Sequence, residues 1–465
     1  MARVSAPIAE VKRTSSVQPH STLTQAWGTV LVGTFTILWI IGLAQAQPAG
    51  NPCSAAPALP MTGTRMVNVS TESALQSAVA NAQNGDTLLI ANGTYNLTNS
   101  LYLNGKHNVT IRGTSGCDGV VLVGKGMDNP NHGNVLVGIW SNALNTTIAH
   151  LTIRDTYDNA IAFNSGAQAP HVYSVKLLNA GSQFVKSNPT DGPNGIGVDN
   201  GILEYSWMEY TAGPPATDHG AGVGYTNGIS AHAVDNWSIR NNQFKNFHTP
   251  DTAAYLWNPA VLIWNHSSNV LTEGNVFINV DRAVAYGLQN TTGTDNQGGT
   301  IRNNFVYMAP GLYSASRKAG SDGTIIVNDS PNTKVYHNTI LTNGNLRESI
   351  EFRFASTTGG EARNNLTDAP INLSRDGASA VQSGNNGSAT PSMFVNPNAA
   401  DLHLLSTATQ AIDKAPALSV VTTDIDGNSR PLGAGADIGA DEFTPMGGGD
   451  TIPPAPPTGL TFTPR

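Results

Sequence analysis

Short apolar runs alternate with polar turns along most of the chain. From about residue 155, a β-rich run is followed by an Asn/Asp/Ser turn and then by a second β-rich run that ends in Asn. Alternation of apolar and polar residues is sharpest in the run 350–354. Ile350, Phe352 and Phe354 fall on one face, and Glu351 and Arg353 fall on the other. This period of two predicts half-buried strands.

The second runs recur at a spacing typical of a solenoid. Their final residues are Asn242, Asn275, Asn304, Asn338 and Asn365, which lie 33, 29, 34 and 27 positions apart. A repeat of roughly 20 to 50 residues with a drifting length indicates coils that carry loops of different sizes. Short strands with no helices between them cannot build a βαβ sheet. They can wind as a parallel β-helix, in which equivalent residues stack ~4.8 Å apart.

The repeating Asn residues have a structural explanation. Asn tolerates the left-handed backbone that a coil needs at a corner, and its amide can hydrogen-bond to the Asn of the next coil. We therefore expect these residues to form a ladder.

Aligning the first runs by the Asn that follows each predicts which side chains face outward. One outward column is expected to hold Asn164, His232, Asn265, Gly287 and Asn328. Phe354 is expected to point into the core, so the next residue, Ala355, points outward. The alignment places Ala355 in this column, and the whole column is therefore expected to face outward.

An adjoining outward column and one inward position follow from the same alignment. Ser230, Ile263, Ile326 and Arg353 are expected outside, whereas Trp264 is expected in the core beside Val327.

Residues 72–82 predict an N-terminal capping α-helix. Ser70 or Thr71 can cap its first turn. A cap is needed because exposed strands at the end of a β-helix would template aggregation. One apolar helical stripe holds Ala74, Leu75, Ala78, Val79 and Ala82.

Three segments carry a resemblance to a known family. GDTLLIANGTY (residues 85–95) resembles the opening of secreted right-handed parallel β-helix proteins of the pectate-lyase-like superfamily. DIDGNSRP (424–431) and DIGADEF (437–443) resemble the close of the same group's helical domain. The resemblance implies an all-β, right-handed parallel β-helix. It does not single out a reaction, because lyases, hydrolases, epimerases and binding proteins share this fold.

The chain is expected to contain four parts. Residues 1–46 indicate a signal peptide, because an apolar run (27–44) is followed by Ala44-Gln45-Ala46, the pattern that a signal peptidase recognises. An uncleaved anchor is the alternative, since a bilayer needs ~20 apolar residues. We expect a secreted protein with an N-terminal extension (47–65), a β-helix domain (66–443) and a Gly/Pro-rich linker or tail (444–465).

Composition narrows the function classes. The chain is 39% hydrophobic and 12% charged, with 48 Gly, which excludes a disordered chain and argues against a helical bundle. Lys+Arg number 24 against 32 Asp+Glu, a net charge of -8, with no basic cluster. We expect no nucleic-acid partner. An anionic glycan needs a local basic site or a bridging cation, so Ca²⁺ stays open as a cofactor. A monomer is expected.

Cys53 and Cys117 are the only cysteines. In an oxidising compartment, an even pair suggests one disulfide that ties the start of the mature chain to an early coil. Two unrelated thiols are the alternative.

Four residues are candidates for catalysis. β-Elimination of a uronate needs a base that removes the C5 proton and a cation beside the carboxylate. His232 is the candidate base. Lys186 is the candidate cation, and it is expected to point outward because an unpaired buried lysine is costly. Arg282 and Arg353 are further cations, and their alternatives are ion pairs with the neighbouring Asp281 and Glu351.

Other residues are candidates for substrate binding. Asn164, Asn265 and Asn328 line the outward column, and three aromatic residues could stack on sugar rings: Trp207, Tyr225 and Trp257. The loops 188–200 and 213–225 are expected on the same side of the early coils, and loops this long are usually functional.

Two function classes follow. The first is a polysaccharide lyase that acts by β-elimination on a uronate-containing glycan. The second is a non-catalytic glycan-binding or cell-surface β-helix. A glycoside hydrolase is a further alternative, because Thr190-Asp191-Gly192 and Asp218-His219-Gly220 echo polygalacturonase elements. The Asp-Asp doublet of that family is missing, however, and inverting hydrolysis needs paired carboxylates.

Overall fold

The computed structural model describes residues 50–190, 195–288 and 294–444. The predicted signal peptide lies outside these residues, as does the predicted linker except for residue 444. In the part of the chain that is described, no helix is long and apolar enough to cross a membrane.

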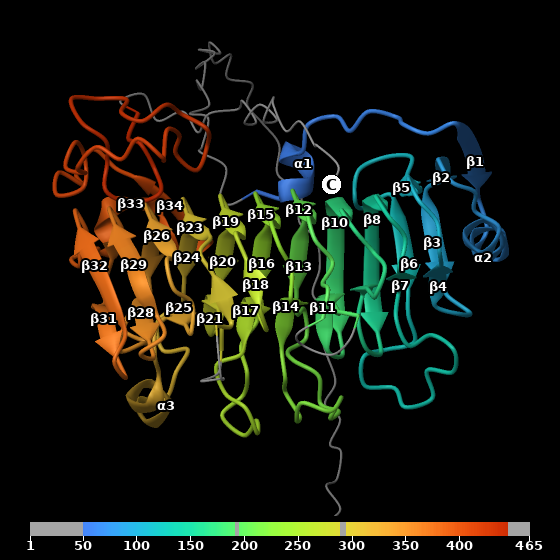
Figure 1. Ribbon diagram of the computed structural model, residues 1–465, viewed down its shortest axis with the longest axis horizontal. Coiled ribbons are helices and arrows are strands. Elements are labelled where there is room, and N and C mark those ends of the chain that lie inside the picture. The colour runs from blue at the N-terminus through green and yellow to red at the C-terminus, as the bar shows by residue number, and fades with distance from the viewer. Residues whose placement is uncertain (1–49, 191–194, 289–293, 445–465) are drawn as a thin grey trace, which may run out of the picture. The chain divides into compact units, whose positions relative to one another are not determined.

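The described chain winds as a right-handed parallel β-helix whose successive coils stack along one axis (Figure 1). Among these residues, two rows of strands form a 20-stranded sheet and a third row forms a ten-stranded sheet. The strands β8 and β10 bend and belong to both rows of the larger sheet.

The first row of the 20-stranded sheet consists of β1 (Arg65–Val69), β2 (Asp86–Ile90), β5 (Thr110–Gly113), β8 (Thr147–Thr156), β10 (His171–Ala180), β12 (Ile202–Glu204), β15 (Ser238–Arg240), β19 (Leu271–Glu273), β23 (Thr300–Arg302), β26 (Lys334–Tyr336), β29 (Thr358–Arg363) and β32 (Ser379–Ser383). The second row adds β3 (Gly93–Asn96), β6 (Val120–Val123), β13 (Trp207–Glu209), β16 (Gln243–Lys245), β20 (Val276–Ile278), β24 (Phe305–Tyr307), β27 (Thr339–Leu341) and β30 (Leu366–Thr367).

The ten-stranded sheet consists of β4 (Leu101–Leu103), β7 (Ile139–Ser141), β9 (Ile161–Phe163), β11 (Gln183–Ser187), β14 (Asn227–His232), β17 (Pro259–Trp264), β21 (Arg282–Tyr286), β25 (Ile325–Asn328), β28 (Ile350–Arg353) and β31 (Ile371–Arg375). A short pair, β18 (Ser267–Ser268) and β22 (Asn296–Gln297), lies outside these rows.

Equivalent residues of successive coils pair in register, and this builds the core. Val261 of β17 pairs with Ile229 of β14 and with Val284 of β21. Burying one such side chain contributes about 1.5–3 kcal/mol. The same inward column continues, fully buried, through Ile139, Ile161, Val185, Ile325 and Ile350.

The repeating Asn residues form the predicted ladder. The side-chain and backbone nitrogens of Asn242 both donate to Oδ1 of Asn275, each at 3.0 Å. The same pair of hydrogen bonds joins Asn275 to Asn304, Asn304 to Asn338, and Asn338 to Asn365. Each side-chain amide also donates to a backbone carbonyl of the preceding coil. The ladder therefore satisfies these amides in the interior.

The left-handed backbone falls one residue before the ladder. Asn241, Asn303 and Asn364 have φ of 57°, 53° and 57°, and Gly274 has φ of 65°. The bend sends the chain directly into the second row, for example into β16. The sequence pattern predicts two runs per coil and misses this third strand, because no turn residue separates it from the ladder Asn.

The N-terminal cap agrees with its prediction. Helix α2 (Glu72–Ala80) has Thr71 as N-cap, whose hydroxyl accepts a hydrogen bond from the backbone nitrogen of Ala74. Leu75 and Val79 are buried against the first coils.

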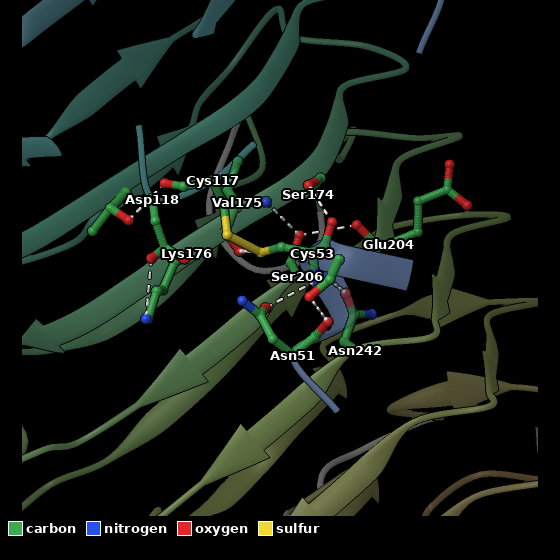
Figure 2. Close-up of a disulfide and its surroundings, with 12 residues drawn as sticks. Asn51, Cys53, Cys117, Asp118, Ser174, Val175, Lys176, Glu204, Ser206 and Asn242 are labelled. Carbon is green, nitrogen blue, oxygen red and sulfur yellow. Dashed lines mark hydrogen bonds and ion pairs between the residues drawn. A yellow bond between two sulfur atoms is a disulfide. The ribbon is translucent and has the colours of Figure 1, made fainter. Parts of the chain in front are cut away.

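The N-terminal extension lies along the outer side of the first row (Figure 1). The short helix α1 (Pro52–Ala55) carries Cys53, which forms a disulfide with Cys117 (Figure 2). Further along, the Tyr173 hydroxyl donates to the carbonyl of Pro57, and Arg112 donates to that of Leu59. The structure thus pairs the two cysteines and fastens the extension to the early coils.

The C-terminal residues fold back over the outer side of the second row. β33 (Phe394–Asn396) and β34 (Asp401–Leu404) pair antiparallel, beside the 3₁₀ turns Pro391–Met393 and Pro397–Ala399. Their apolar side chains contact those of β24 and β27.

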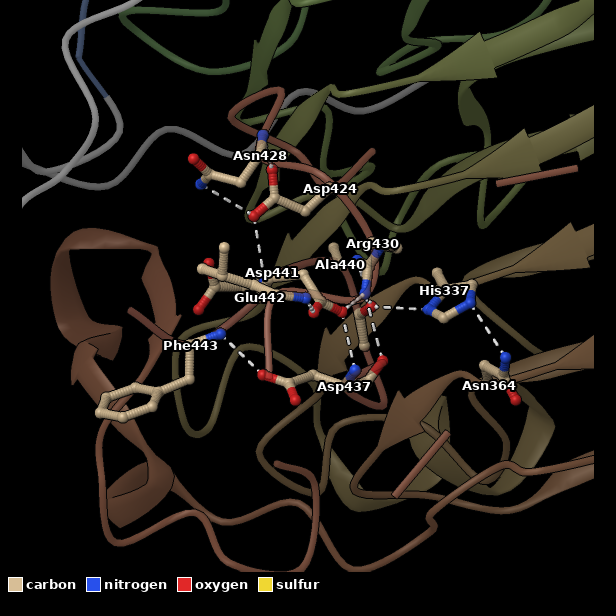
Figure 3. Close-up of polar contacts among 12 residues, drawn as sticks. His337, Asn364, Asp424, Asn428, Arg430, Asp437, Ala440, Asp441, Glu442 and Phe443 are labelled. Atoms are coloured by element: carbon tan, nitrogen blue, oxygen red, sulfur yellow. Dashed lines mark hydrogen bonds and ion pairs between the residues drawn. The ribbon is translucent and has the colours of Figure 1, made fainter. Parts of the chain in front are cut away.

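The DIDGNSRP and DIGADEF segments hold this C-terminal region together. Arg430 forms a buried ion pair with Glu442 at 2.6 Å, and Asp437 accepts hydrogen bonds from the backbone nitrogens of Asp413 and Phe443 (Figure 3). Asp424 accepts from the backbone nitrogen of Glu442. These carboxylates therefore have a structural role.

The ladder predicts a position-dependent loss of stability. Asn304→Ala leaves several buried polar groups without partners, so we expect the free energy of unfolding to fall by about 3 kcal/mol. Asn385→Ala is the matched control at the end of the ladder, where Asn385 is partly exposed and water can replace the lost hydrogen bonds. Thermal melting followed by circular dichroism measures both. Equal losses in the two variants would contradict the structural role of the buried rungs.

Candidate functional site

The outer face of the ten-stranded sheet carries two columns of side chains. The first column runs, in paired register, through Tyr102, Trp140, Ala162, Lys186, Ser230, Leu262, Ala285, Ile326 and Glu351. The second column lies two residues further along each strand and includes Asn164, Asn188, His232, Trp264, Asn328 and Arg353. Both columns are polar in the coils of β11 and β14, and in the coil of β9 the second column is polar, with Asn164.

Lys186 and His232 meet in these coils. Nζ of Lys186 lies 2.6 Å from Nε2 of His232 and 3.2 Å from Oγ of Ser230. On the other side of the imidazole, the side-chain amide of Asn265 lies 2.6 Å from Nδ1.

Two further amides lie in the second column of the same coils. Nδ2 of Asn188 donates to Oδ1 of Asn164 at 2.9 Å. We call Asn164, Lys186, Asn188, Ser230, His232 and Asn265 the lysine–histidine patch.

Burial moves the pKa values of both ionisable groups in the patch. It lowers the pKa of Lys186 to about 8, although the charge of Asp158 acts in the opposite direction. Burial, together with the charge of Lys186, lowers the pKa of His232 to about 3. At neutral pH, His232 is therefore neutral, and Lys186 can lose its proton just above neutral pH.

The contacts of His232 can accommodate both forms of Lys186. A neutral imidazole donates from one nitrogen and accepts at the other. When Lys186 is an ammonium it donates to Nε2, and Nδ1–H then needs an acceptor, so the Asn265 amide, whose Nδ2 faces Nδ1 here, has to turn its oxygen toward the ring. When Lys186 is a neutral amine, Nε2–H can donate to it instead. The imidazole thus supports the lysine in either protonation state.

Residues before β7, β9 and β14 border the patch on one side, and the repeat pattern does not identify them. Asp158 interacts electrostatically with Lys186, and burial raises its own pKa. The rings of His132 and Tyr157 are stacked, with centroids 4.1 Å apart, and His219 meets Tyr157 edge-on at 4.6 Å. Of these residues, only His219 had a signal in the sequence, namely the length of its loop and the Asp218-His219-Gly220 element.

The two candidate arginines lie away from the patch. β21 and β28 are three and five coils from β11, or about 14 and 24 Å along the axis. Arg282 pairs with Asp322 and Arg353 with Asp376, so neither forms the ion pair expected from sequence neighbours.

The predicted alignment of the outward columns is out of register by one residue at β17. Trp264, not Asn265, pairs with His232, and its ring lies on the outer face 4.7 Å from the imidazole. The expectation that Trp264 belongs to the core is therefore wrong. Asn265 follows in a left-handed turn with φ of 53°, which still brings its amide to His232.

The same slip affects two other predictions. Ile263 is fully buried in the core instead of facing outward. β28 ends at Arg353, which pairs with Asn328, and Phe354 has φ of 72° instead of continuing the strand inward. A shift of one residue exchanges the two faces of a strand, and coils of unequal length hide that shift from a sequence alignment.

The candidate binding residues other than Asn164 and Asn265 lie outside the patch. Trp207 is in the second row, with the amino groups of Lys176 and Lys245 at 5.2 and 5.9 Å from its ring. Asn328 is buried three coils from His232.

Tyr225 and Trp257 have structural contacts in the loops. The Tyr225 hydroxyl bonds to Asn227 and Gln183 at the start of β14 and β11. Trp257 packs with Met308 and Tyr313, next to helix α3 (Ala315–Gly320).

The two long loops border opposite ends of the strands. Residues 188–200 leave the end of β11, whereas 213–225 lead into the start of β14. The expectation that they lie on the same side is therefore wrong, although both border the sheet that carries the patch. Residues 191–194 of the first loop are outside the described residues.

One group of side chains could be considered as a metal site. His403, Asp426 and Asp441 bring potential ligand atoms within 4.8 Å of one another. Burial lowers the pKa of His403, but hydrogen bonds to Asp401 and Asp426 outweigh burial and raise it well above its usual value. A protonated imidazole has no lone pair for a metal, so this group fits an ion-pair network.

The lysine–histidine patch does not form a calcium site from its own residues. Ca²⁺ takes roughly six to eight oxygen ligands, often carboxylates. Among the residues that the structure describes, Asp158 is the one carboxylate whose charge acts on Lys186. Calcium dependence therefore stays a prediction, and we derive no step through a metal.

The low pKa of His232 is open to direct measurement. Its imidazole should stay neutral down to about pH 3, because burial disfavours the charged form. In Lys186→Met, the pKa should rise because a nearby positive charge is gone, yet stay below 6.5 because burial remains. NMR titration of ¹⁵N-histidine-labelled protein follows both, with His232→Gln as the control that assigns the signal. A His232 signal that titrates near pH 6.5 in the wild type would contradict the buried patch.

No protein-family model and no curated protein sequence matches the chain. Among solved structures, pectate lyase Pel9A is 12% identical, with 84% of this chain and 100% of that chain covered and a TM-score of 0.42. A Bacillus sp. N165 pectate lyase in complex with trigalacturonate is 13% identical, with 61% and 84% covered and a TM-score of 0.39. PfbA, a surface adhesin of Streptococcus pneumoniae, is 13% identical, with 63% and 80% covered and a TM-score of 0.40. These similarities carry no argument about the reaction. The strand register itself establishes the parallel β-helix that the sequence predicts, and no subfamily is singled out.

Proposed function

We propose that this protein is a polysaccharide lyase that cleaves a uronate-containing glycan by β-elimination at the lysine–histidine patch. The observation that supports it most is the 2.6 Å contact between Lys186 and His232 on an outer sheet face, with the pKa of Lys186 at about 8. The disulfide is in keeping with an oxidising compartment, and secretion stays a prediction.

Lys186 is the better candidate for the base. A general base works best when its pKa lies near the operating pH. The sequence predicts His232 as the base and Lys186 as the cation, but His232 has a pKa of about 3 and its Nε2 is occupied by Lys186. The pKa values therefore favour the reverse assignment.

In the proposed reaction, the neutral amine of Lys186 takes the proton from C5 of the uronate. The electron pair of that C–H bond forms the C4–C5 double bond, and the bond from C4 to the glycosidic oxygen breaks. The leaving oxygen takes a proton from the Lys186 ammonium, which returns the lysine to its starting form. No net proton is gained or lost.

Amide and hydroxyl groups of the patch can stabilise the charge that develops on the uronate carboxylate. Ser230 contacts the lysine, and Asn164 and Asn188 bond to each other in the neighbouring column; hydrogen-bond donors aimed at a developing charge are effective in a site that excludes water. This role takes the place of the arginines that the sequence suggests, because Arg282 and Arg353 are paired elsewhere.

The pH dependence tests the role of Lys186. The base must be deprotonated, so kcat/KM on uronate polymers should rise with pH through about 8. Lys186→Met should lower kcat by about 10²–10⁴-fold, and Lys186→Arg should not restore it because guanidinium keeps its proton. The ultraviolet absorbance of the unsaturated product, with polygalacturonate and alginate as substrates, gives the rates. A profile that is flat from pH 6 to 9 would rule out this base.

His232→Gln is the matched control for the assignment. Gln keeps hydrogen-bonding atoms beside Lys186 but cannot act as a base, so we expect a loss of about tenfold or less. A loss as large as that of Lys186→Met would instead favour His232 as the base.

A glycan-binding protein without catalysis is the second candidate. It is favoured by the pairing of both candidate arginines with carboxylates and by the net charge of -8. It predicts binding of uronate glycans with no unsaturated product, unchanged in Lys186→Met.

A further inference from the structure

We infer that Tyr102 and Trp140 form a sugar-binding subsite for the same glycan chain, on the side of Lys186 that leads to the N-terminal coils. The inference rests on the proposed function for the position of the reacting sugar. Its ligand is a pyranose ring of a uronate-containing glycan.

The register places both aromatic rings in the column of Lys186. Tyr102 of β4 pairs with Trp140 of β7, Trp140 pairs with Ala162 of β9, and Ala162 pairs with Lys186 of β11. Trp140 is therefore two coils and Tyr102 three coils from Lys186, or about 10 and 14 Å along the axis. Ala162, 3% exposed, adds no protruding side chain between Trp140 and the lysine.

Both rings are available to a ligand. Tyr102 is 52% exposed, Trp140 is half-buried, and their centroids lie 5.9 Å apart with an interplanar angle of 52°. Within the described residues, neither the Tyr102 hydroxyl nor the Trp140 indole nitrogen has a hydrogen-bond partner. Such rings offer an apolar face to a sugar ring and a polar group to its hydroxyls.

The opposite direction along the column is covered. Beyond Ser230, the outward residues Leu262, Ala285 and Ile326 are buried, and Trp264 and Leu288 pack against them. The exposed Tyr102 and the half-buried Trp140 lie in the other direction, so we expect a glycan that reaches Lys186 to continue toward them. The arrangement favours a chain that lies parallel to the axis of the β-helix and crosses its strands.

The distances predict a dependence on glycan length. A saccharide of one or two units at Lys186 does not reach Tyr102, whereas a longer one contacts both rings. The subsite should therefore contribute to the affinity of long oligosaccharides and polymers only.

The test compares binding of short and long glycans in the full chain. Isothermal titration in the Lys186→Met background, where cleavage is blocked, uses disaccharides to octasaccharides of polygalacturonate and alginate. Adding Tyr102→Ala and Trp140→Ala together should weaken binding of the longest oligosaccharides about tenfold and leave the disaccharides unchanged. With Lys186 intact, the same double variant should raise KM on the polymer and leave kcat unchanged.

Tyr255→Ala is the matched control, because Tyr255 is 65% exposed in the loop before β17 and outside this column. A melting curve confirms that each variant is folded. The inference is overturned if the double variant binds long oligosaccharides as the control does, if it weakens disaccharides equally, or if the wild type binds none of the glycans. Ring-dependent binding without any product in the wild type would support the subsite and reject the lyase reaction.

Discussion

Register between successive coils is the constraint on which the rest of the structure depends. Each buried ladder Asn donates twice to the Asn of the next coil and once to the preceding coil, so a slip of one residue would leave several buried amides without partners. Apolar columns inside the coils impose the same register, because a slip would bring polar residues into the core. Residues 46 positions apart, such as Lys186 and His232, come into contact for this reason.

Charge pairing separates Lys186 from the other buried cations. Arg282, Arg317 and Arg430 each contact a carboxylate, which offsets the cost of burying a charge. Among the described residues, no carboxylate lies within ion-pair distance of Lys186, whose contacts are Ser230 and His232. A buried cation without a carboxylate partner does not stabilise the fold. A pKa lowered by burial, as that of Lys186 is, is typical of residues in functional sites.

The sequence predicted those structural features whose residue pattern either repeats along the chain or lies within one short segment. The Asn spacing predicts the ladder and the coils, and the apolar stripe with Thr71 predicts helix α2. His232 was identified because its run aligns by the ladder Asn that follows it, and Lys186 because it lies in the run between Asn164 and His232 and is costly to bury without a partner. Ion-pair partners were not predictable, because Arg282 and Asp322 lie 40 residues apart and Arg353 and Asp376 lie 23 apart, in different coils.

Two other features escaped prediction for different reasons. The slip at Trp264 arose because turns of unequal length separate the strands of each coil, so the ladder fixes the register of the first row more firmly than that of the ten-stranded sheet. Tyr102 and Trp140 precede residue 155, from which the repeat is recognised, so no repeat signal aligned them with Lys186.

An acidic protein that acts on an acidic glycan must solve an electrostatic problem locally. Charges more than about 10 Å away are largely screened at physiological ionic strength, so the net charge of -8 matters less than the groups within the patch. A uronate carboxylate beside Lys186 favours the ammonium and raises the pKa of the lysine, which removes the free amine that the reaction needs. Burial acts in the opposite direction and brings the pKa to about 8 before substrate binds. The uncharged amides of Asn164 and Asn188 can then bind the carboxylate without adding a charge that would shift the lysine further. On this argument, a buried lysine among amides suits a uronate lyase better than an arginine-rich patch would.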